Sequence, residues 1–166
     1  EMSSRGLGDV YKRQMVQGAG GMVMYDVEGM NALLKIAKEH DVILIADEVM
    51  TGFGRTGKMF ASEYYETMPD IMAMSKALTG GTMPLSLTTT KTFIFEQFLS
   101  DDKVKTFFHG HSYTGNPTAC AAALASLDLM EKPDYKQNME RINLQHQAFI
   151  KICLLYTSDA ADEAKC

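Results

Sequence analysis

The chain of 166 residues has only three cysteines, four prolines and no tryptophan. Two of the cysteines, Cys153 and Cys166, fall within the last fourteen residues, so Cys120 is the one thiol of the interior. No disulfide framework can form within the chain, which excludes small disulfide-stapled secreted folds and makes a cytoplasmic location the expectation. Cys120 stands in a run of alanines, where a free thiol usually serves as a small buried hydrophobic group.

Long apolar runs and an excess of positive charge are also missing. No apolar run approaches the roughly 20 residues that a bilayer-spanning helix needs. The formal net charge is −5, and this mildly acidic balance provides no electrostatic footprint for nucleic acid or for an anionic membrane surface. We therefore expect no nucleic-acid partner and no membrane partner.

The two ends of the chain resemble translated DNA adapter rather than protein selected to fold. If residues 9–14 are written gat gtg tat aag aga cag, the reverse complement encodes residues 153–158 in another frame. Ends translated from opposite strands of one element resemble an adapter used in sequencing libraries. We therefore set residues 1–14 and 153–166 aside as adapter-like. We expect them to pack against nothing and to lack a reproducible fold, the alternative being a natural disordered tail.

The interior alternates segments that are typical of helices and of strands. Helices are expected over residues 29–40, 92–99, 117–130 and 134–152. Strands are expected over residues 42–46, 71–74 and 85–89. The unbroken β-branched run 42–46 is typical of a strand buried on both faces of a parallel sheet, and the other two are weaker candidates of that type. Asn116 and Pro117 suit the N-cap and the first position of a helix. The alternation predicts an α/β domain with a mostly parallel sheet.

Two charged residues at predicted strand ends are the first candidates for chemistry. Asp47 ends the most apolar strand, and Lys76 follows the next candidate strand 29 residues later. In open α/β sheets, ligands bind beyond the carboxyl ends of the strands. An acid in that place is costly to bury unless it meets a cation or a hydrogen-bond donor. Spacing alone leaves a structural ion pair between the two residues as an equal alternative.

Three motifs in order resemble the signature of class III (omega) aminotransferases. They lie at residues 45–57, 69–71 and 75–81, and the likeness covers nearly all of residues 15–131. The resemblance implies a fragment of the large domain of a fold type I pyridoxal-phosphate (PLP) transferase, with its mostly parallel sheet and flanking helices. Residues 132–152 would then begin the C-terminal region, and the fragment alone is expected to be inactive.

The resemblance assigns roles at the two strand ends. Lys76 is expected to be the catalytic lysine, which binds the PLP aldehyde covalently, contacts substrate and, once freed, moves the proton between substrate and cofactor. Asp47 is expected to bind the pyridine nitrogen and hold it protonated, so that the ring accepts the electrons left by proton removal. Val49 is expected to pack against the face of the ring.

A second motif, residues 107–117, is similar to the family's loop that reaches across a homodimer. The resemblance implies that the Ser112 hydroxyl donates to the phosphate of the partner's cofactor. His111, where many relatives carry proline, is assigned to the same cofactor site, and Gly110 is expected to contact substrate. Two histidines in this loop could suggest a metal, but no cysteine or carboxylate lies close by in sequence, and no metal site is expected.

Within the class, the sequence most resembles the branch that acts in biotin synthesis. Residues 15–22, 76–81 and 108–123 follow that branch's pattern. Met50 stands where the ornithine and 4-aminobutyrate branches usually carry glutamine. This likeness implies amino transfer from S-adenosylmethionine, with lysine as the alternative donor, to 8-amino-7-oxononanoate, giving 7,8-diaminononanoate.

Two alternatives stay open on the sequence. The chain could belong to another omega-aminotransferase acting on ornithine, 4-aminobutyrate or a diamine. It could also be a non-catalytic α/β nucleotide-binding fragment, which would need a phosphate loop and would not need Lys76. The glycine-rich residues 18–21 lack the Lys-Ser/Thr ending of such a loop and are interpreted as turn glycines.

Overall fold

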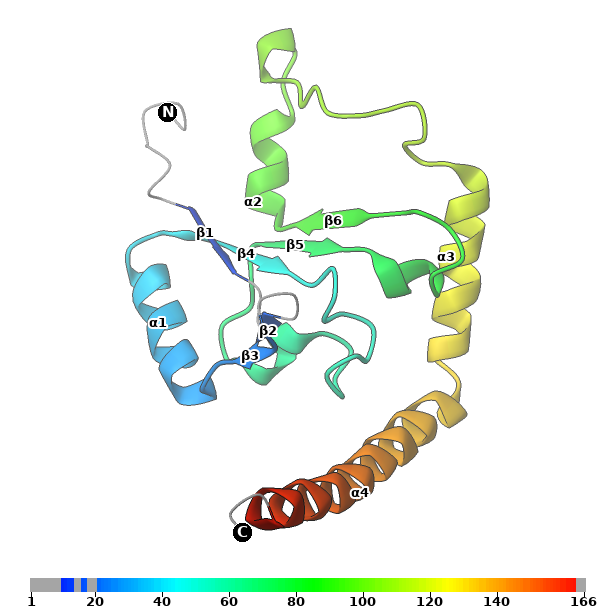
Figure 1. Cartoon of the computed structure of the whole chain (residues 1–166). Helices are drawn as coiled ribbons and strands as arrows, with labels where there is room; N and C mark the ends of the chain where they lie inside the picture. Colours follow the sequence, from blue (N-terminus) through cyan, green and yellow to red (C-terminus); the bar gives the residue numbers. More distant parts are fainter. Residues whose placement is uncertain (1–9, 14–15, 18–20, 164–166) are drawn as a thin grey trace. The chain divides into compact units, whose positions relative to one another are not determined.

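The computed structural model describes residues 10–13, 16–17 and 21–163. It divides the chain into two compact units, Glu1–Leu127 and Asp128–Cys166. The strands are β1 (Val10–Arg13), β2 (Val16–Gln17), β3 (Val23–Met24), β4 (Ile43–Asp47), β5 (Ile71–Met74) and β6 (Leu87–Thr90) (Figure 1). The α-helices are α1 (Val27–Glu39), α2 (Thr92–Phe95), α3 (Pro117–Met130) and α4 (Pro133–Glu163). Short 3-10 helices are η3 (Ala61–Tyr64), η4 (Lys76–Thr79), η5 (Glu96–Phe98) and η6 (Lys103–Lys105).

A four-stranded sheet in the order β1-β4-β5-β6 forms the centre of the first unit. Strands β1 and β5 run parallel to β4, whereas β6 runs antiparallel to β5. The predicted α/β class is confirmed, as are the strands predicted over 42–46 and 71–74. A separate antiparallel pair joins β2 to β3.

The strand predicted over 85–89 is present as β6, but its predicted parallel, doubly buried character is wrong. All four of its residues are exposed, and it pairs antiparallel with β5. A parallel neighbour needs a crossover connection, usually with an α-helix. The connection between β5 and β6 holds only the four-residue turn η4, so the chain turns back along the edge of the sheet.

Residues 10–13 were expected to pack against nothing, and that prediction is wrong. They form β1, which pairs with β4 from Val10 opposite Ile43 to Arg13 opposite Ala46. Backbone pairing uses N–H and C=O groups that every residue except proline carries. The otherwise unpaired edge of β4 therefore accepts a neighbouring extended segment without requiring a matched sequence.

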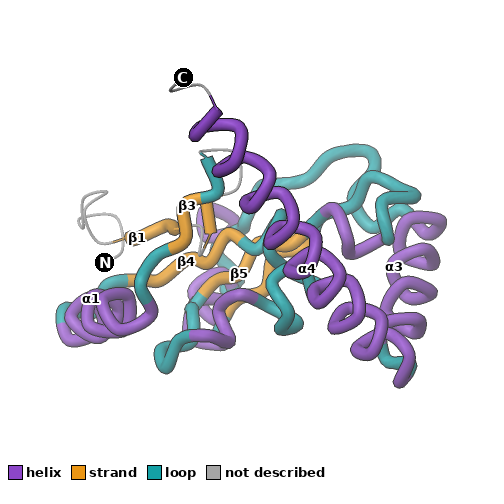
Figure 2. The backbone as a smooth tube through the Cα atoms, turned by 60° about the horizontal axis from the view of Figure 1, so that its bottom comes forward, coloured by secondary structure: helices purple, strands orange, loops and turns teal. Residues whose placement is uncertain are grey.

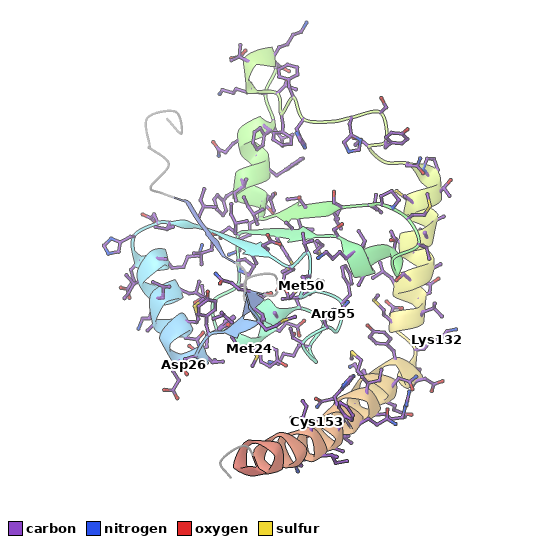
Figure 3. All side chains as sticks on the ribbon, viewed as in Figure 1. Met24, Asp26, Met50, Arg55, Lys132 and Cys153 are labelled. Atoms are coloured by element: carbon purple, nitrogen blue, oxygen red, sulfur yellow. The ribbon has the colours of Figure 1, made fainter. Side chains whose placement is uncertain are left out.

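Helix α1 covers one face of β4 and forms the main core with it. Its N-cap is Asp26, marked in Figure 3, whose side chain accepts a hydrogen bond from the Gly29 amide at 2.7 Å. This cap starts the helix at Val27, two residues before the predicted start. The buried members of the core cluster are Met30, Leu34, Leu44, Ala46, Ala61 and Tyr65.

The buried carboxyl group of Asp70 ties α1, β4 and the start of α2 together. It accepts the Leu44 amide at 2.9 Å and forms ion pairs with Lys38 and with Lys91. The backbone of Asp70 donates to the Leu44 carbonyl at 2.8 Å and accepts from the Lys91 amide at 2.9 Å. Asp70 thus anchors the amino-terminal ends of β4 and β5, opposite to the ends where ligands are expected.

The helices of the second half of the chain begin largely as predicted. Helix α3 starts at Pro117, and the Asn116 side chain accepts the Ala119 amide at 3.1 Å, which confirms the predicted cap. The helix predicted over 92–99 divides into α2 and η5. Helix α4 continues to Glu163, beyond the predicted end at 152, so the expectation that the segment after 152 lacks a fold is wrong for residues 153–163. None of the helices in the described part of the chain is long and apolar enough to cross a membrane.

Candidate active site

The carboxyl ends of β4 and β5 lie side by side, because the two strands are parallel and paired (Figure 2). Asp47 is the last residue of β4 and is in register with Ala73 of β5. Lys76 follows Ala73 by three residues, just after β5 ends. The structure therefore brings the two predicted residues to neighbouring strand ends, with Asp47 half-buried and Lys76 exposed.

The backbone at Lys76 adopts a left-handed conformation, with φ of 47°. This region is unfavourable for a residue with a side chain and typically costs about 1–3 kcal/mol. Hydrogen bonds on both sides stabilise the turn: the Ser75 hydroxyl donates to the Leu85 carbonyl at 2.7 Å, and the Thr79 hydroxyl donates to the Met83 carbonyl at 2.6 Å. A strained backbone held by its surroundings is a feature of functional sites.

The carboxyl group of Asp47 is oriented by the backbone that follows it. Its Oδ1 atom accepts a hydrogen bond from the Val49 amide at 3.2 Å. The Glu48 amide between them donates to the Ala73 carbonyl at 2.9 Å, which continues the pairing with β5 by one residue. Val49 is half-buried on the same short turn. Asp47, Val49 and Lys76 thus belong to one locally ordered edge of the sheet.

The sequence interpretation gave no role to Glu48, which is completely buried. Its carboxyl group accepts the Thr51 hydroxyl and the amides of Ala61 at 3.1 Å and Ser62 at 2.7 Å. A signal was available in the sequence, because side chains alternate between the faces of a strand. Glu48 continues the buried series of Leu44 and Ala46.

The loop after β4 is a tight turn that admits no side chain at Gly52. The Gly52 amide donates to the Glu48 carbonyl at 3.0 Å, and a Cβ on Gly52 would lie 2.9 Å from that oxygen. Met50 and Arg55 lie on the same loop, as Figure 3 shows, and Arg55 is exposed. The glycine in this motif is therefore required by close backbone approach.

The residues predicted from the second motif lie on a separate, exposed loop between η6 and α3 (Figure 1). Hydrogen bonds form within this loop. The His111 amide donates to the Thr114 hydroxyl at 2.9 Å, and the Tyr113 amide donates to His111 Nδ1 at 3.1 Å. Gly110, His111 and Ser112 are all exposed. The described residues include no cluster of His, Cys, Asp and Glu that could hold a metal ion.

Comparison with known proteins shows the family of the chain. Residues 14–151 match the model of the aminotransferase class III family. The adenosylmethionine-8-amino-7-oxononanoate aminotransferase of Geobacter sulfurreducens is 50% identical over 118 residues, which are 70% of this chain and 26% of that protein. The chain therefore spans about a quarter of the length of this relative.

Solved structures show the same fold. The adenosylmethionine-8-amino-7-oxononanoate aminotransferase of Methanocaldococcus jannaschii superposes with a TM-score of 0.76 at 40% identity, over 83% of this chain and 33% of that one. An ornithine aminotransferase of Toxoplasma gondii with partial occupancy of PLP in its active site gives 0.74 at 27% identity, over 86% and 32%. The fold is that of the fold type I, PLP-dependent transferases. Within that class, the chain belongs to the class III aminotransferases.

Proposed function

We propose that this chain is part of an aminotransferase of biotin synthesis, which transfers the amino group of S-adenosylmethionine to 8-amino-7-oxononanoate and forms 7,8-diaminononanoate. The main observation behind this proposal is that Asp47 and Lys76 lie at the adjacent carboxyl ends of β4 and β5. The specific reaction is supported by relatives that are named for it and by Met50 on the loop after β4.

The side chains at this edge fit PLP by their chemistry. Lys76 offers an exposed primary amine for an aldehyde, Asp47 offers a carboxyl group for a pyridine nitrogen, and Val49 offers a branched apolar surface for a ring face. When bound, PLP supplies an electron sink for the electron pair that remains when a substrate carbon loses its proton. The same edge would bind substrate next to Lys76.

Each residue would then have a distinct task. The Lys76 amine would hold the cofactor covalently in the resting enzyme and, once displaced by the substrate amine, accept and return the substrate proton. The Asp47 carboxyl group would keep a proton on the ring nitrogen through a charge-assisted hydrogen bond. The hydrogen bond from the Val49 amide limits the rotation of that carboxyl group.

The exposed loop that carries Gly110, His111 and Ser112 would complete the site of a second copy. In the homodimer that the two copies would form, the Ser112 hydroxyl would donate to a phosphate oxygen of the partner's cofactor. His111 would line the cofactor site, and Gly110 would leave space for substrate. The solvent exposure of Phe108 and Tyr113, at 83% and 74%, supports a surface that is covered in the assembled enzyme. We place this small-molecule enzyme in the cytoplasm.

Substitution of the two strand-end residues tests the catalytic roles in the full-length enzyme that contains this segment. Lys76→Ala is expected to abolish the absorbance of lysine-bound PLP and to lower transamination at least about a thousandfold. Asp47→Asn is expected to leave PLP bound while removing most of the rate. Lys105→Ala, at an exposed lysine outside this edge, is the control. A Lys76→Ala enzyme with a near wild-type rate would refute the assignment.

A panel of amino donors tests the specific reaction. With 8-amino-7-oxononanoate as acceptor, we expect S-adenosylmethionine, or less effectively lysine, to donate the amino group. Ornithine and 4-aminobutyrate with 2-oxoglutarate are expected to react poorly. A clear preference for ornithine or 4-aminobutyrate would move the chain to another class III branch and leave Lys76 and Asp47 in their roles.

A further inference from the structure

Glu48 occupies a position that stability alone does not account for. Its side chain is 0% exposed, and its three described hydrogen-bond donors are all neutral. Burying a carboxyl group costs free energy, and replacing a buried acid together with its hydrogen-bond partners by apolar groups of the same shape can be nearly neutral or stabilising. A buried acid one residue after a proposed cofactor-binding acid therefore points to a role in arranging the site.

The donors to Glu48 come from two places in the sequence, and together they close the loop after β4. The Thr51 hydroxyl lies three residues downstream, within the first turn of the loop. The amides of Ala61 and Ser62 lie at the start of η3, where the loop ends. One carboxyl group thus holds both ends of the loop against the end of β4.

The turn fixed by Glu48 contains the hydrogen-bond donor that orients Asp47. The bond from the Gly52 amide to the Glu48 carbonyl and the bond from the Thr51 hydroxyl to the Glu48 side chain close this turn around Val49. The Val49 amide in turn donates to Asp47 Oδ1 at 3.2 Å. If the turn relaxes, the Val49 amide moves, and the Asp47 carboxyl group loses its fixed direction.

We propose that Glu48 is a positioning residue for Asp47: through Thr51 and the amides of Ala61 and Ser62 it holds the turn that aims the Asp47 carboxyl group. Glu48 directly follows Asp47, the last residue of β4, and its amide continues the pairing with β5. The two side chains therefore leave opposite faces of the sheet. Glu48 therefore acts from the core side, without touching cofactor or substrate. This inference rests on the proposed PLP chemistry of Asp47.

The test uses the full-length enzyme with PLP bound and compares two equally buried hydroxyl groups. Thr51→Val removes the hydroxyl that donates to Glu48, and Thr51→Ser restores it. Ser62→Ala removes a hydroxyl on a side chain that is also 1% exposed but keeps the backbone amide that donates to Glu48. Glu48→Gln changes the acceptor itself. The readouts are the pH midpoint of the absorbance change of bound PLP, kcat and KM.

Thr51→Val is expected to shift the pH midpoint of bound PLP and to lower kcat about tenfold with KM changed less than about twofold. Thr51→Ser is expected to restore both values, and Ser62→Ala to leave them unchanged. Glu48→Gln should give a larger effect, and the Thr51 pair decides the matter if that variant does not fold. An unchanged midpoint and kcat in Thr51→Val overturns the inference and leaves Glu48 a purely structural residue. A wild-type enzyme without lysine-bound PLP overturns the proposed function, and the inference with it.

Discussion

Replacement of Asp70 by asparagine is the most direct test of how the sheet is anchored. Asn is close to Asp in shape and retains an oxygen for the Leu44 amide, but it has no charge for Lys38 and Lys91. The Asp70 side chain is 1% exposed, whereas those of the two lysines are 34% and 46% exposed. The lysines would regain hydration after the change, so each lost ion pair counts for about 1 kcal/mol or less.

The bond from the Leu44 amide adds to this loss, because hydrogen bonds to charged groups contribute about 1.5–3 kcal/mol and part of that contribution depends on the charge. We therefore expect Asp70→Asn to lower the free energy of unfolding by about 2–3 kcal/mol at neutral pH. The assay is urea denaturation of the chain, followed by far-ultraviolet circular dichroism. Asp101→Asn, at an exposed acid, is the control and should change little.

The same substitution has a predicted pH dependence. Burial raises the pKa of Asp70, but the Leu44 amide, Lys38 and Lys91 together outweigh burial, so the folded pKa lies below the ordinary value of 3.8. The ionised group therefore stabilises the folded chain fully above pH 3.8, and this contribution is lost as the pH falls through the folded pKa. The difference between wild type and Asp70→Asn should shrink in that acidic range. An equal difference at pH 7 and pH 3, or one no larger than that of Asp101→Asn, would refute the reasoning.

Two further substitutions test local geometry by the same denaturation assay. Asn116→Ala removes the side-chain acceptor at the start of α3 and should cost about 1 kcal/mol; Asn138→Ala, inside α4, should not destabilise, and equal effects would argue against the cap. Gly52→Ala forces a Cβ to 2.9 Å from the Glu48 carbonyl and should cost about 1–3 kcal/mol. Gly110→Ala, whose nearest contact would be 3.7 Å, should be nearly neutral; a stable Gly52→Ala variant would contradict the turn described for this loop.

Features that depend on neighbouring residues were predictable from the sequence. The apolar run that becomes β4 is extended and partly or fully buried because its β-branched side chains favour strands and its length suits one. Asn116 caps α3 because the acceptor and the amide that it binds are three residues apart. The strands predicted from the apolar runs placed Asp47 and Lys76 at consecutive strand ends, and the parallel pairing of β4 with β5 agrees with that placement.

Features that depend on distant segments were decided only by the tertiary structure. β6 runs antiparallel because the connection from β5 holds no α-helix that could carry the chain across the sheet. β1 pairs with β4 because that edge of β4 has no other strand beside it. Glu48 is buried because donors at Ala61 and Ser62 return to it from the far end of a loop. The left-handed backbone of Lys76 persists because surrounding hydrogen bonds hold its turn. Local sequence specifies helix caps and strand character, whereas the partners of a buried acid and the unpaired edge of a sheet exist only once the chain has folded.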